Sequence, residues 1–274
     1  MPELPEVETI RCALERRILG LSITRVELFS PAMRCPLAPL TNPELLHSPV
    51  LRCTRRGRYL VIEFTNRSAL ILHFGMSGVV RVESPEVPKR KHEHIFFHLS
   101  DGQLMRFECP RRFSSVVLSK IPEGREFPPE LESLGVEPLS PAFSGEFLYR
   151  VSRNRALPVK ALLMNNDIVT GVGNIYATEA LFTASVSPLR PAGKLTKIEC
   201  NNLVQAIVKV LTAAIEAGGS TIHDFRNVDG TEGKFSLQLE VYGKAGLPCP
   251  RCGTTILAKK IGGRTSAYCP KCQK

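Results

Sequence analysis

The sequence predicts an α+β protein with several domains: an N-terminal helix plus an antiparallel β-sandwich, then a helical region and a cysteine-bearing β-hairpin. Three observations lead to this fold class. A helical apolar pattern at the start gives way to many short β-rich runs, the pattern becomes helical again after a proline-rich stretch, and two Cys-x₂-Cys pairs close the chain. The 274 residues are enough for two domains, or for one domain and an appendage.

The N-terminal helix is predicted over residues 5–19. Its apolar residues recur at helical spacing and share one face: Val7, Ile10, Leu14 and Ile18. Pro5 suits the first turn of a helix, and Gly20 suits its end.

A β-rich region follows the helix. Its predicted strands are short and separated by turn residues: Ile23–Phe29, Tyr59–Phe64, Ala69–Phe74, Ile95–Leu99, Gln103–Phe107 and Ser115–Leu118. Asp101-Gly102 is typical of a tight hairpin turn. Many short strands at this spacing favour an antiparallel sandwich, and the proline-rich stretch from Pro122 to Pro141 is expected to connect it to the next domain.

Beyond that connection the pattern is helical. The predicted helices are Phe143–Arg153, Val159–Met164, Asn174–Phe182 and about Lys197–Ala217. The last helix has an expected buried stripe of Leu203, Ile207, Val210, Leu211, Ala214 and Ile215. Gly218-Gly219 ends it, and a polar segment over residues 220–234 precedes the cysteine-bearing tail.

The tail ends in two Cys-x₂-Cys pairs that are 16 residues apart: Cys249 with Cys252, and Cys269 with Cys272. This spacing is typical of four thiolates around one structural Zn²⁺, and the alternative is four thiols in a disordered tail. Between the pairs, Ile256–Ile261 and Arg264–Tyr268 are predicted strands joined by Gly262-Gly263, so the tail is predicted to be a β-hairpin ribbon. Arg264, beside the hairpin tip, is either a phosphate ligand or a solvated surface arginine.

The charge of the chain points to a polyanionic partner. There are 36 Lys and Arg against 26 Asp and Glu, which gives a net charge of +10 and a pI near 9.3. No apolar run approaches about 18 residues, so no membrane partner is expected, and the acidic start is unlike a secretory signal. The five cysteines outside the tail lack a disulfide spacing, which suits a reducing cytosol.

The first residues carry the candidate chemistry. If Met1 is removed, Pro2 presents a secondary amine beside Glu3. A neutral backbone amine is a nucleophile, and its attack on an aldehyde-like carbon gives an iminium that acts as an electron sink. Glu3 is placed to act as the accompanying acid or base. The alternative is structural, with Glu3, Glu6 and Glu8 stabilising the positive end of a helix.

Other segments each allow two interpretations. Gly171-Val172-Gly173-Asn174 predicts either a phosphate site at a helix N-terminus, with Asn174 as its cap, or an ordinary helix corner. His73 by itself is more typical of a core histidine than of a ligand contact. Four arginines of one segment form either a charged strand edge or a row of phosphate ligands: Arg52, Arg55, Arg56 and Arg58.

Taken in order, these motifs resemble the formamidopyrimidine-DNA glycosylase family of bacterial base-excision repair, from Met1 to the last cysteine. The matching runs are Pro2-Glu3-Leu4-Pro5-Glu6-Val7-Glu8-Thr9, His73-Phe74-Gly75-Met76-Ser77-Gly78, Pro110-Arg111-Arg112-Phe113, Gly171-Val172-Gly173-Asn174-Ile175-Tyr176-Ala177, Gly218-Gly219-Ser220-Thr221 and the four-cysteine tail. The Leu4-Pro5 form of the terminus is more similar to this branch than to the endonuclease VIII branch, which shares the architecture.

The resemblance implies a bifunctional glycosylase and lyase that acts on damaged double-stranded DNA. Pro2 would attack C1′ of the damaged nucleotide, and successive β- and δ-eliminations would cut both flanking phosphodiesters. Glu3 would protonate the sugar oxygen and Glu6 would support the site. Arg58 and Arg264 match two further positions of the family's catalytic site.

The resemblance also implies residues that contact DNA. Those that would fill the gap left by an extruded nucleotide are Met76, Arg111 and Phe113, since apolar wedges offset part of the cost of unstacking. Those that match backbone-phosphate contacts are His73, Asn174, Tyr242 and Arg264. The segment after Gly218-Gly219-Ser220-Thr221 corresponds to the loop that covers an everted oxidised purine.

The sequence departs from the family's usual pattern at several positions. Arg58 replaces a usual lysine, and because arginine does not give up its proton, a proton-transfer role there is in doubt. Cys109 and Asn165 stand at usual aspartates, Ser114 at a usual glycine and His223 at a usual basic residue. The nucleophile, the acid and the zinc ligands are intact, so a working enzyme is expected.

The full prediction is an α+β multidomain enzyme that excises oxidised purines, 8-oxoguanine and formamidopyrimidines, and cleaves the abasic site. Its expected domains are a catalytic β-sandwich over 1–133, a helix–two-turn–helix domain with the lesion-recognition loop over 134–238, and a zinc ribbon over 239–274. A monomer with one structural Zn²⁺ is expected, in the cytoplasm at the nucleoid. The alternatives are an endonuclease VIII-like enzyme for oxidised pyrimidines and a DNA-binding protein without catalysis.

Overall fold

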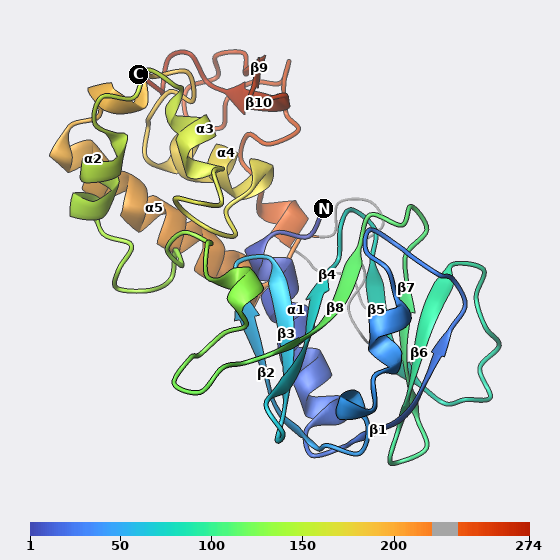
Figure 1. The fold of residues 1–274 in the computed structure, drawn as a ribbon. Coiled ribbons are helices and arrows are strands. Elements are labelled where there is room, and N and C mark those ends of the chain that lie inside the picture. The colour runs from blue at the N-terminus through green and yellow to red at the C-terminus, as the bar shows by residue number, and fades with distance from the viewer. Residues whose placement is uncertain (221–234) are drawn as a thin grey trace. The chain divides into compact units, whose positions relative to one another are not determined.

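The computed structural model describes residues 1–220 and 235–274 and divides the chain into two compact units (Figure 1). The first unit contains residues 1–132 and 218–220. The second contains residues 133–217 and 235–274. A linker of 3-10 and irregular structure around Pro129–Leu131 leads from the first unit towards the second along the chain.

The first unit is one helix and two antiparallel sheets, which confirms the predicted β-sandwich. Helix α1 spans Leu4–Ile18. The strands are β1 (Ile23–Leu28), β2 (Val50–Arg56), β3 (Tyr59–Phe64), β4 (Ser68–His73), β5 (Val79–Glu83), β6 (Glu93–Leu99), β7 (Leu104–Glu108) and β8 (Ser115–Lys120). One sheet has the strand order β1-β6-β7-β5 and the other has the order β2-β3-β4-β8.

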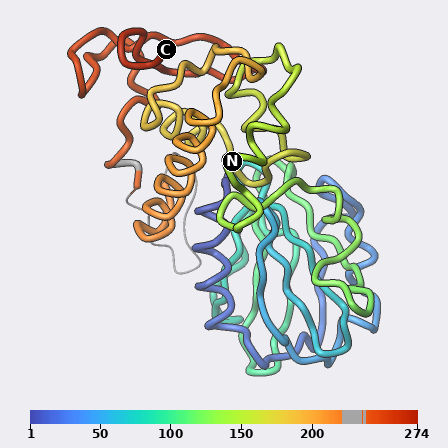
Figure 2. The backbone as a smooth tube through the Cα atoms, turned by 90° about the vertical axis from the view of Figure 1, so that its left-hand side faces the viewer, coloured from blue at the N-terminus to red at the C-terminus, as the bar shows by residue number. Residues whose placement is uncertain are grey.

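The core of this unit joins both sheets to the apolar face of α1. The four predicted face residues of the helix are buried: Val7, Ile10, Leu14 and Ile18. They belong to the same apolar cluster as Leu60 and Leu72 of one sheet and Phe97 of the other. The helix lies beside β2 and β3 (Figures 1 and 2). Packing α1 on the sandwich therefore fixes the start of the chain at one end of a sheet.

The second unit is helical and ends in a two-stranded ribbon, as predicted. Its helices are α2 (Gly145–Ser152), α3 (Val159–Leu163), α4 (Asn174–Thr183) and α5 (Lys197–Glu216). The ribbon pairs β9 (Leu257–Ile261) with β10 (Arg264–Tyr268) in antiparallel register. Helix α5 begins at a capping box in which Thr196 and Glu199 bond each other's backbone N–H groups.

Two strands were absent from the sequence prediction. The sequence does not predict strand β2, because four of the five residues after Leu51 are charged or polar, yet this segment forms an edge strand of its sheet. Strand β5 follows Gly78 directly and is only 5 residues long, so the preceding turn masked it.

Helix α5 meets a simple length-and-composition criterion for a membrane-spanning helix. Among the described helices it is long and apolar enough, by length and composition alone, to cross a membrane. Core helices of soluble proteins meet the same criterion, and α5 packs against α2 and α4. Of its predicted stripe, Ile215 is only partly buried and the others are buried: Leu203, Ile207, Val210, Leu211 and Ala214.

Candidate functional site

The start of α1 buries two carboxylates beside the first residues of the chain. Pro2 is buried, and the exposed fractions of Glu3 and Glu6 are only 4% and 2%. Glu6 Oε2 accepts the backbone N–H of Glu3 at 2.8 Å. Its other oxygen accepts the backbone N–H and the hydroxyl of Ser220 at 2.8 and 3.0 Å. Glu6 therefore ties the N-terminus to a segment more than 200 residues away in the sequence.

The N-terminal amine lies in an environment that favours its neutral form. Burial lowers the pKa of the Met1 amino group below its ordinary value of 8.0, and the positive charges of Arg58 and Arg111 lower it further. Glu3 and Glu6 act in the opposite direction without reversing the shift. The neutral, nucleophilic form of the Met1 amino group is therefore more populated at neutral pH than it would be in water.

Arg58, in the turn between β2 and β3, and His73, at the end of β4, lie next to this terminus. The Arg58 side chain is buried, and its Nη1 lies 4.0 Å from the sulfur of Met1. Burial, followed by the charges of Arg34 and Arg58, lowers the pKa of His73 to about 4, so His73 is neutral at pH 7. Because Gly75 N–H donates to His73 Nδ1 at 3.3 Å, the ring proton is on Nε2, which can donate to an anion.

Two arginines of the Arg52–Arg58 segment form ion pairs with carboxylates. Arg52 pairs with Glu63 at 2.6 Å, and Arg55 pairs with Glu8 of α1 at 3.0 Å. These ion pairs suit the charged-edge interpretation of β2. Arg58, in the turn that follows β2, lies near the N-terminus.

The structure brings Met76, Arg111 and Phe113 together on two touching loops. Met76 and Phe113 expose 45% and 55% of their surface, and Arg111 is exposed as well. A Cβ atom added at Gly75 would lie 2.7 Å from the carbonyl carbon of Phe113, so the two backbones are in close contact. The exposure of both apolar side chains excludes core packing as their explanation.

Asn174 begins α4 in the second unit, but it is not the cap of that helix. The N-cap is Gly173, and Asn174 Oδ1 accepts a hydrogen bond from Lys160 Nζ at 2.6 Å. The expected capping role is therefore wrong, because the lysine occupies the oxygen. Lys160 is fully buried and also donates to Ser266 Oγ at 2.7 Å, which joins α3, α4 and β10. Nothing in the local sequence pattern predicted this buried lysine.

Tyr242 lies in a segment that is held by a buried carboxylate. Glu179 of α4 accepts three successive backbone N–H groups, those of Glu240 at 2.8 Å, Val241 at 3.0 Å and Tyr242 at 2.7 Å. The exposed fraction of Glu179 is 4%. Sequence reasoning missed Glu179 because its partners lie about sixty positions further along the chain.

The four cysteines of the tail form a site of the size that zinc requires. Their sulfurs all lie within 4.8 Å of one another, with 3.9 Å between Cys249 and Cys272 and 3.6 Å between Cys252 and Cys269. A tetrahedral Zn²⁺ with ordinary Zn–S bonds separates its sulfurs by about 3.8 Å, so the set fits this metal. Arg264 is exposed and opens β10, directly after the Gly262-Gly263 turn.

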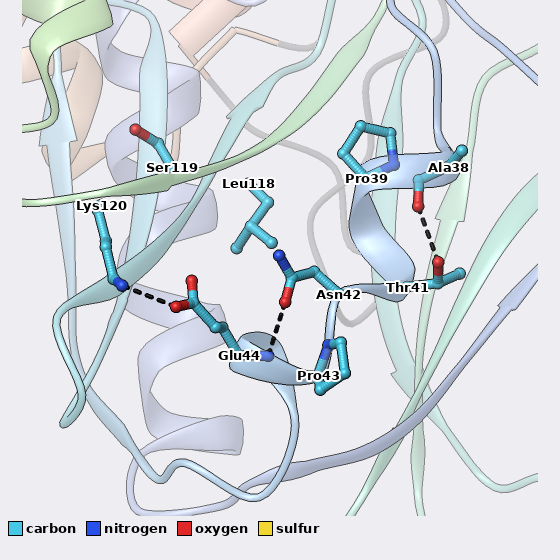
Figure 3. Close-up of a pocket in the computed structure, with 9 residues that line it drawn as sticks. All are labelled: Ala38, Pro39, Thr41, Asn42, Pro43, Glu44, Leu118, Ser119 and Lys120. Atoms are coloured by element: carbon cyan, nitrogen blue, oxygen red, sulfur yellow. Dashed lines mark hydrogen bonds and ion pairs between the residues drawn. The ribbon is translucent and has the colours of Figure 1, made fainter.

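Some predicted features lie elsewhere or outside the described residues. The segment expected to cover the lesion, with His223, falls within residues 221–234 and is not described. A pocket of the first unit is lined by residues near 38–44 and by the end of β8, where Lys120 pairs with Glu44 at 2.8 Å (Figure 3). None of the predicted site residues lines this pocket.

Comparisons with known proteins cover the whole chain. Residues 1–116 match the formamidopyrimidine-DNA glycosylase N-terminal domain, residues 134–226 match the H2TH domain of the same enzyme, and residues 246–274 match a zinc finger found in FPG and IleRS. A formamidopyrimidine-DNA glycosylase of Thioalkalivibrio sulfidiphilus (strain HL-EbGR7) is 43% identical over 274 residues, which is 100% of both chains.

Two solved structures from Lactococcus lactis have the same fold. One is a complex of an FPG mutant with a Fapy-dG containing DNA, with a TM-score of 0.89. The other is a complex of the wild-type FPG (MutM) with an oxidised pyrimidine containing DNA, with a TM-score of 0.87. Each is 32% identical, and each match covers 100% of both chains. The four cysteines of the ribbon are a structural site for one zinc ion. The chain belongs to the formamidopyrimidine-DNA glycosylase family.

Proposed function

We propose that this enzyme excises oxidised purines, 8-oxoguanine and formamidopyrimidines, from double-stranded DNA and then cleaves the strand at the abasic site. The observation that carries the proposal is the buried pair of Glu3 and Glu6 beside Pro2, in surroundings that lower the pKa of the amino group of Met1, the residue before it. A neutral amine and a desolvated carboxyl group beside it are the nucleophile and the acid that this reaction needs. The names of the relatives point to the same substrate class.

In the proposed first step the mature chain begins at Pro2. Its neutral nitrogen attacks C1′ of the damaged nucleotide, the bond from C1′ to the base breaks, and the base leaves with the proton that the nitrogen gives up. The Glu3 carboxyl group protonates the sugar ring oxygen, whose bond to C1′ then breaks. The product is an iminium between Pro2 and the opened sugar.

The iminium then acts as an electron sink for strand cleavage. Loss of a C2′ proton expels the 3′ phosphate, and a second elimination expels the 5′ phosphate. Water hydrolyses the remaining iminium and regenerates the amine. Glu6 positions this site through its bonds to Glu3 and Ser220 rather than by touching the substrate.

Residues of both units would contact the DNA. The trio proposed to fill the gap of the extruded nucleotide is Met76, Arg111 and Phe113. The proposed phosphate contacts are Arg58, His73, Asn174, Tyr242 and Arg264. The neutral His73 would contribute an Nε2–H donor, and Arg58 would contribute a permanent charge. The predicted boundaries at 133 and 238, a monomeric state and a place at the nucleoid remain parts of this proposal.

The experiment is a comparison of three duplexes that contain 8-oxoguanine, a formamidopyrimidine or an oxidised pyrimidine. The proposal predicts excision of both purine lesions at a higher kcat/KM than the pyrimidine. A structure of the Lactococcus relative contains DNA with an oxidised pyrimidine, so the reverse order of kcat/KM would favour the pyrimidine alternative.

A second experiment traps the covalent intermediate with borohydride. Wild-type protein should form a covalent adduct with abasic DNA, and Pro2→Gly should not. DNA binding without any wild-type adduct would indicate a homologue without catalytic activity.

A further inference from the structure

A buried chain of hydrogen bonds joins the loop that carries Met76 to the loop that carries Phe113. Ser114 Oγ donates to the carbonyl oxygen of Phe74 at 2.8 Å. The Cys109 thiol donates in turn to Ser114 Oγ at 3.0 Å. Cys109 and Ser114 are both buried, so water does not compete for these bonds.

The same carbonyl closes the turn around Met76. The Phe74 oxygen also accepts the N–H of Gly78 at 2.7 Å. A Cβ atom added at Gly78 would lie 2.4 Å from Ser114 Oγ, and one added at Gly75, whose φ is +56°, would lie 2.7 Å from the carbonyl carbon of Phe113. The turn therefore rests directly on the second loop, and only glycine fits at both contacts.

The second loop is itself fixed to the rest of the first unit. The Ser114 carbonyl accepts the N–H of Arg34 at 3.1 Å, and His94 Nε2 donates to the Cys109 carbonyl at 3.1 Å. Arg112, with a φ of 55°, donates its N–H to the same Cys109 carbonyl at 3.2 Å. Both ends of the loop are thus anchored, while the side chain of Phe113 remains exposed.

We propose that Ser114 and Cys109 are positioning residues, which hold Met76 and Phe113 at a fixed separation so that they enter the gap of a damaged duplex as one preformed wedge. This inference rests on the gap-filling role proposed above. Neither wedge side chain is packed in the core, so the buried bonds beneath them are what order their backbones. Ordering before binding lowers the entropic cost of insertion, and that saving applies only to DNA with a gap to fill.

The experiment compares the affinity of the zinc-loaded protein for two duplexes, one with a tetrahydrofuran abasic analogue and one undamaged. The measured quantity is the ratio of the two Kd values. Ser114→Ala removes the middle of the bonded chain and should reduce the preference for the abasic duplex about fivefold. Cys109→Ser keeps a donor and should retain the preference, whereas Cys109→Ala should lose part of it. Ser119→Ala is the matched control, since its hydroxyl bonds Glu130 away from both loops.

The inference is overturned if folded Ser114→Ala keeps the full preference, if it weakens binding to both duplexes equally, or if Cys109→Ser loses as much as Cys109→Ala. If the Ser114→Ala protein does not fold, the hydroxyl serves stability alone, and the inference is overturned as well. Binding to the analogue needs no chemistry, so the ratio can be read even if the proposed excision fails. Ser114→Ala should also form the covalent adduct normally at saturating abasic DNA. A normal adduct together with a reduced ratio of the two Kd values would show that Ser114 acts in positioning and not in catalysis.

Discussion

Two buried carboxylates in this chain accept backbone N–H groups from segments that are distant in the sequence, and one of them also accepts from a near neighbour. Glu6 bonds Glu3 and Ser220 at the N-terminus, and Glu179 bonds Tyr242 and its two predecessors. Hydrogen bonds to a charged acceptor are stronger than those between neutral groups, so one side chain can fix a whole segment. In both cases the fixed segment carries a residue of the proposed site.

Replacing Glu179 should therefore destabilise the second unit. Glu179→Ala leaves three buried or partly buried N–H groups without their acceptor, and we expect a loss of about 2–4 kcal/mol in the free energy of unfolding. Glu179→Gln keeps one oxygen acceptor and should lose less. Urea denaturation of the three proteins measures this, and equal stability of Glu179→Ala and wild type would contradict the role given to the carboxylate.

His73 should make the stability of the protein depend on pH in the acid range. Its pKa falls from an ordinary 6.5 to about 4 on folding, so between these values the unfolded chain binds more protons than the folded one. Stability is therefore complete above pH 6.5 and is lost as the pH falls towards 4, by about 2–3 kcal/mol from this group. Urea midpoints from pH 7 to 4 should fall less steeply for His73→Gln; identical slopes would refute the shift.

At the scale of elements, the zinc ribbon is attached to helices rather than folded by itself. Its small apolar cluster includes Phe182 of α4 and Val241 beside the cysteines. Lys160 adds a buried link from α3 to Ser266 of β10. A ribbon with so few apolar contacts depends on its metal for stability, since zinc binding supplies the missing free energy.

Zinc removal should unfold the ribbon and leave the sandwich intact. After chelation we expect hydrogen exchange to become fast in β9 and β10, while β3 and β4, which belong to the buried core, stay protected. Re-addition of Zn²⁺ should restore protection. Slow exchange in a ribbon shown to be metal-free would contradict the structural role of the ion.

The sequence predicted those elements whose signals are local. The bounds of β3 and β10 were correct because each is a compact β-rich run between turn residues. Edge strand β2 was missed because its arginines pair with carboxylates on other elements, Arg52 with Glu63 and Arg55 with Glu8, and the local sequence does not show these pairs. The link from Lys160 to Ser266 spans 106 positions, so no periodicity could reveal it. The departures Cys109 and Ser114 were visible in the sequence, but their mutual contact was not.

At the scale of the whole molecule, the net charge of +10 should make DNA binding strongly dependent on salt. Arg264→Ala should reduce the slope of log K against log salt by about 1 if this arginine binds a phosphate. Arg125→Ala is the control with the same charge change, because Arg125 pairs with Glu132 at 3.3 Å. Equal slopes for both variants would remove Arg264 from the interface.

The proposed mechanism requires a free Pro2 nitrogen to form the bond to deoxyribose. Mass spectrometry of peptides from the borohydride-trapped complex tests it directly. We expect the N-terminal peptide to begin at Pro2, without Met1, and to carry the mass of the reduced sugar remnant. A remnant attached to a lysine instead, or full strand cleavage by protein that retains Met1, would contradict it.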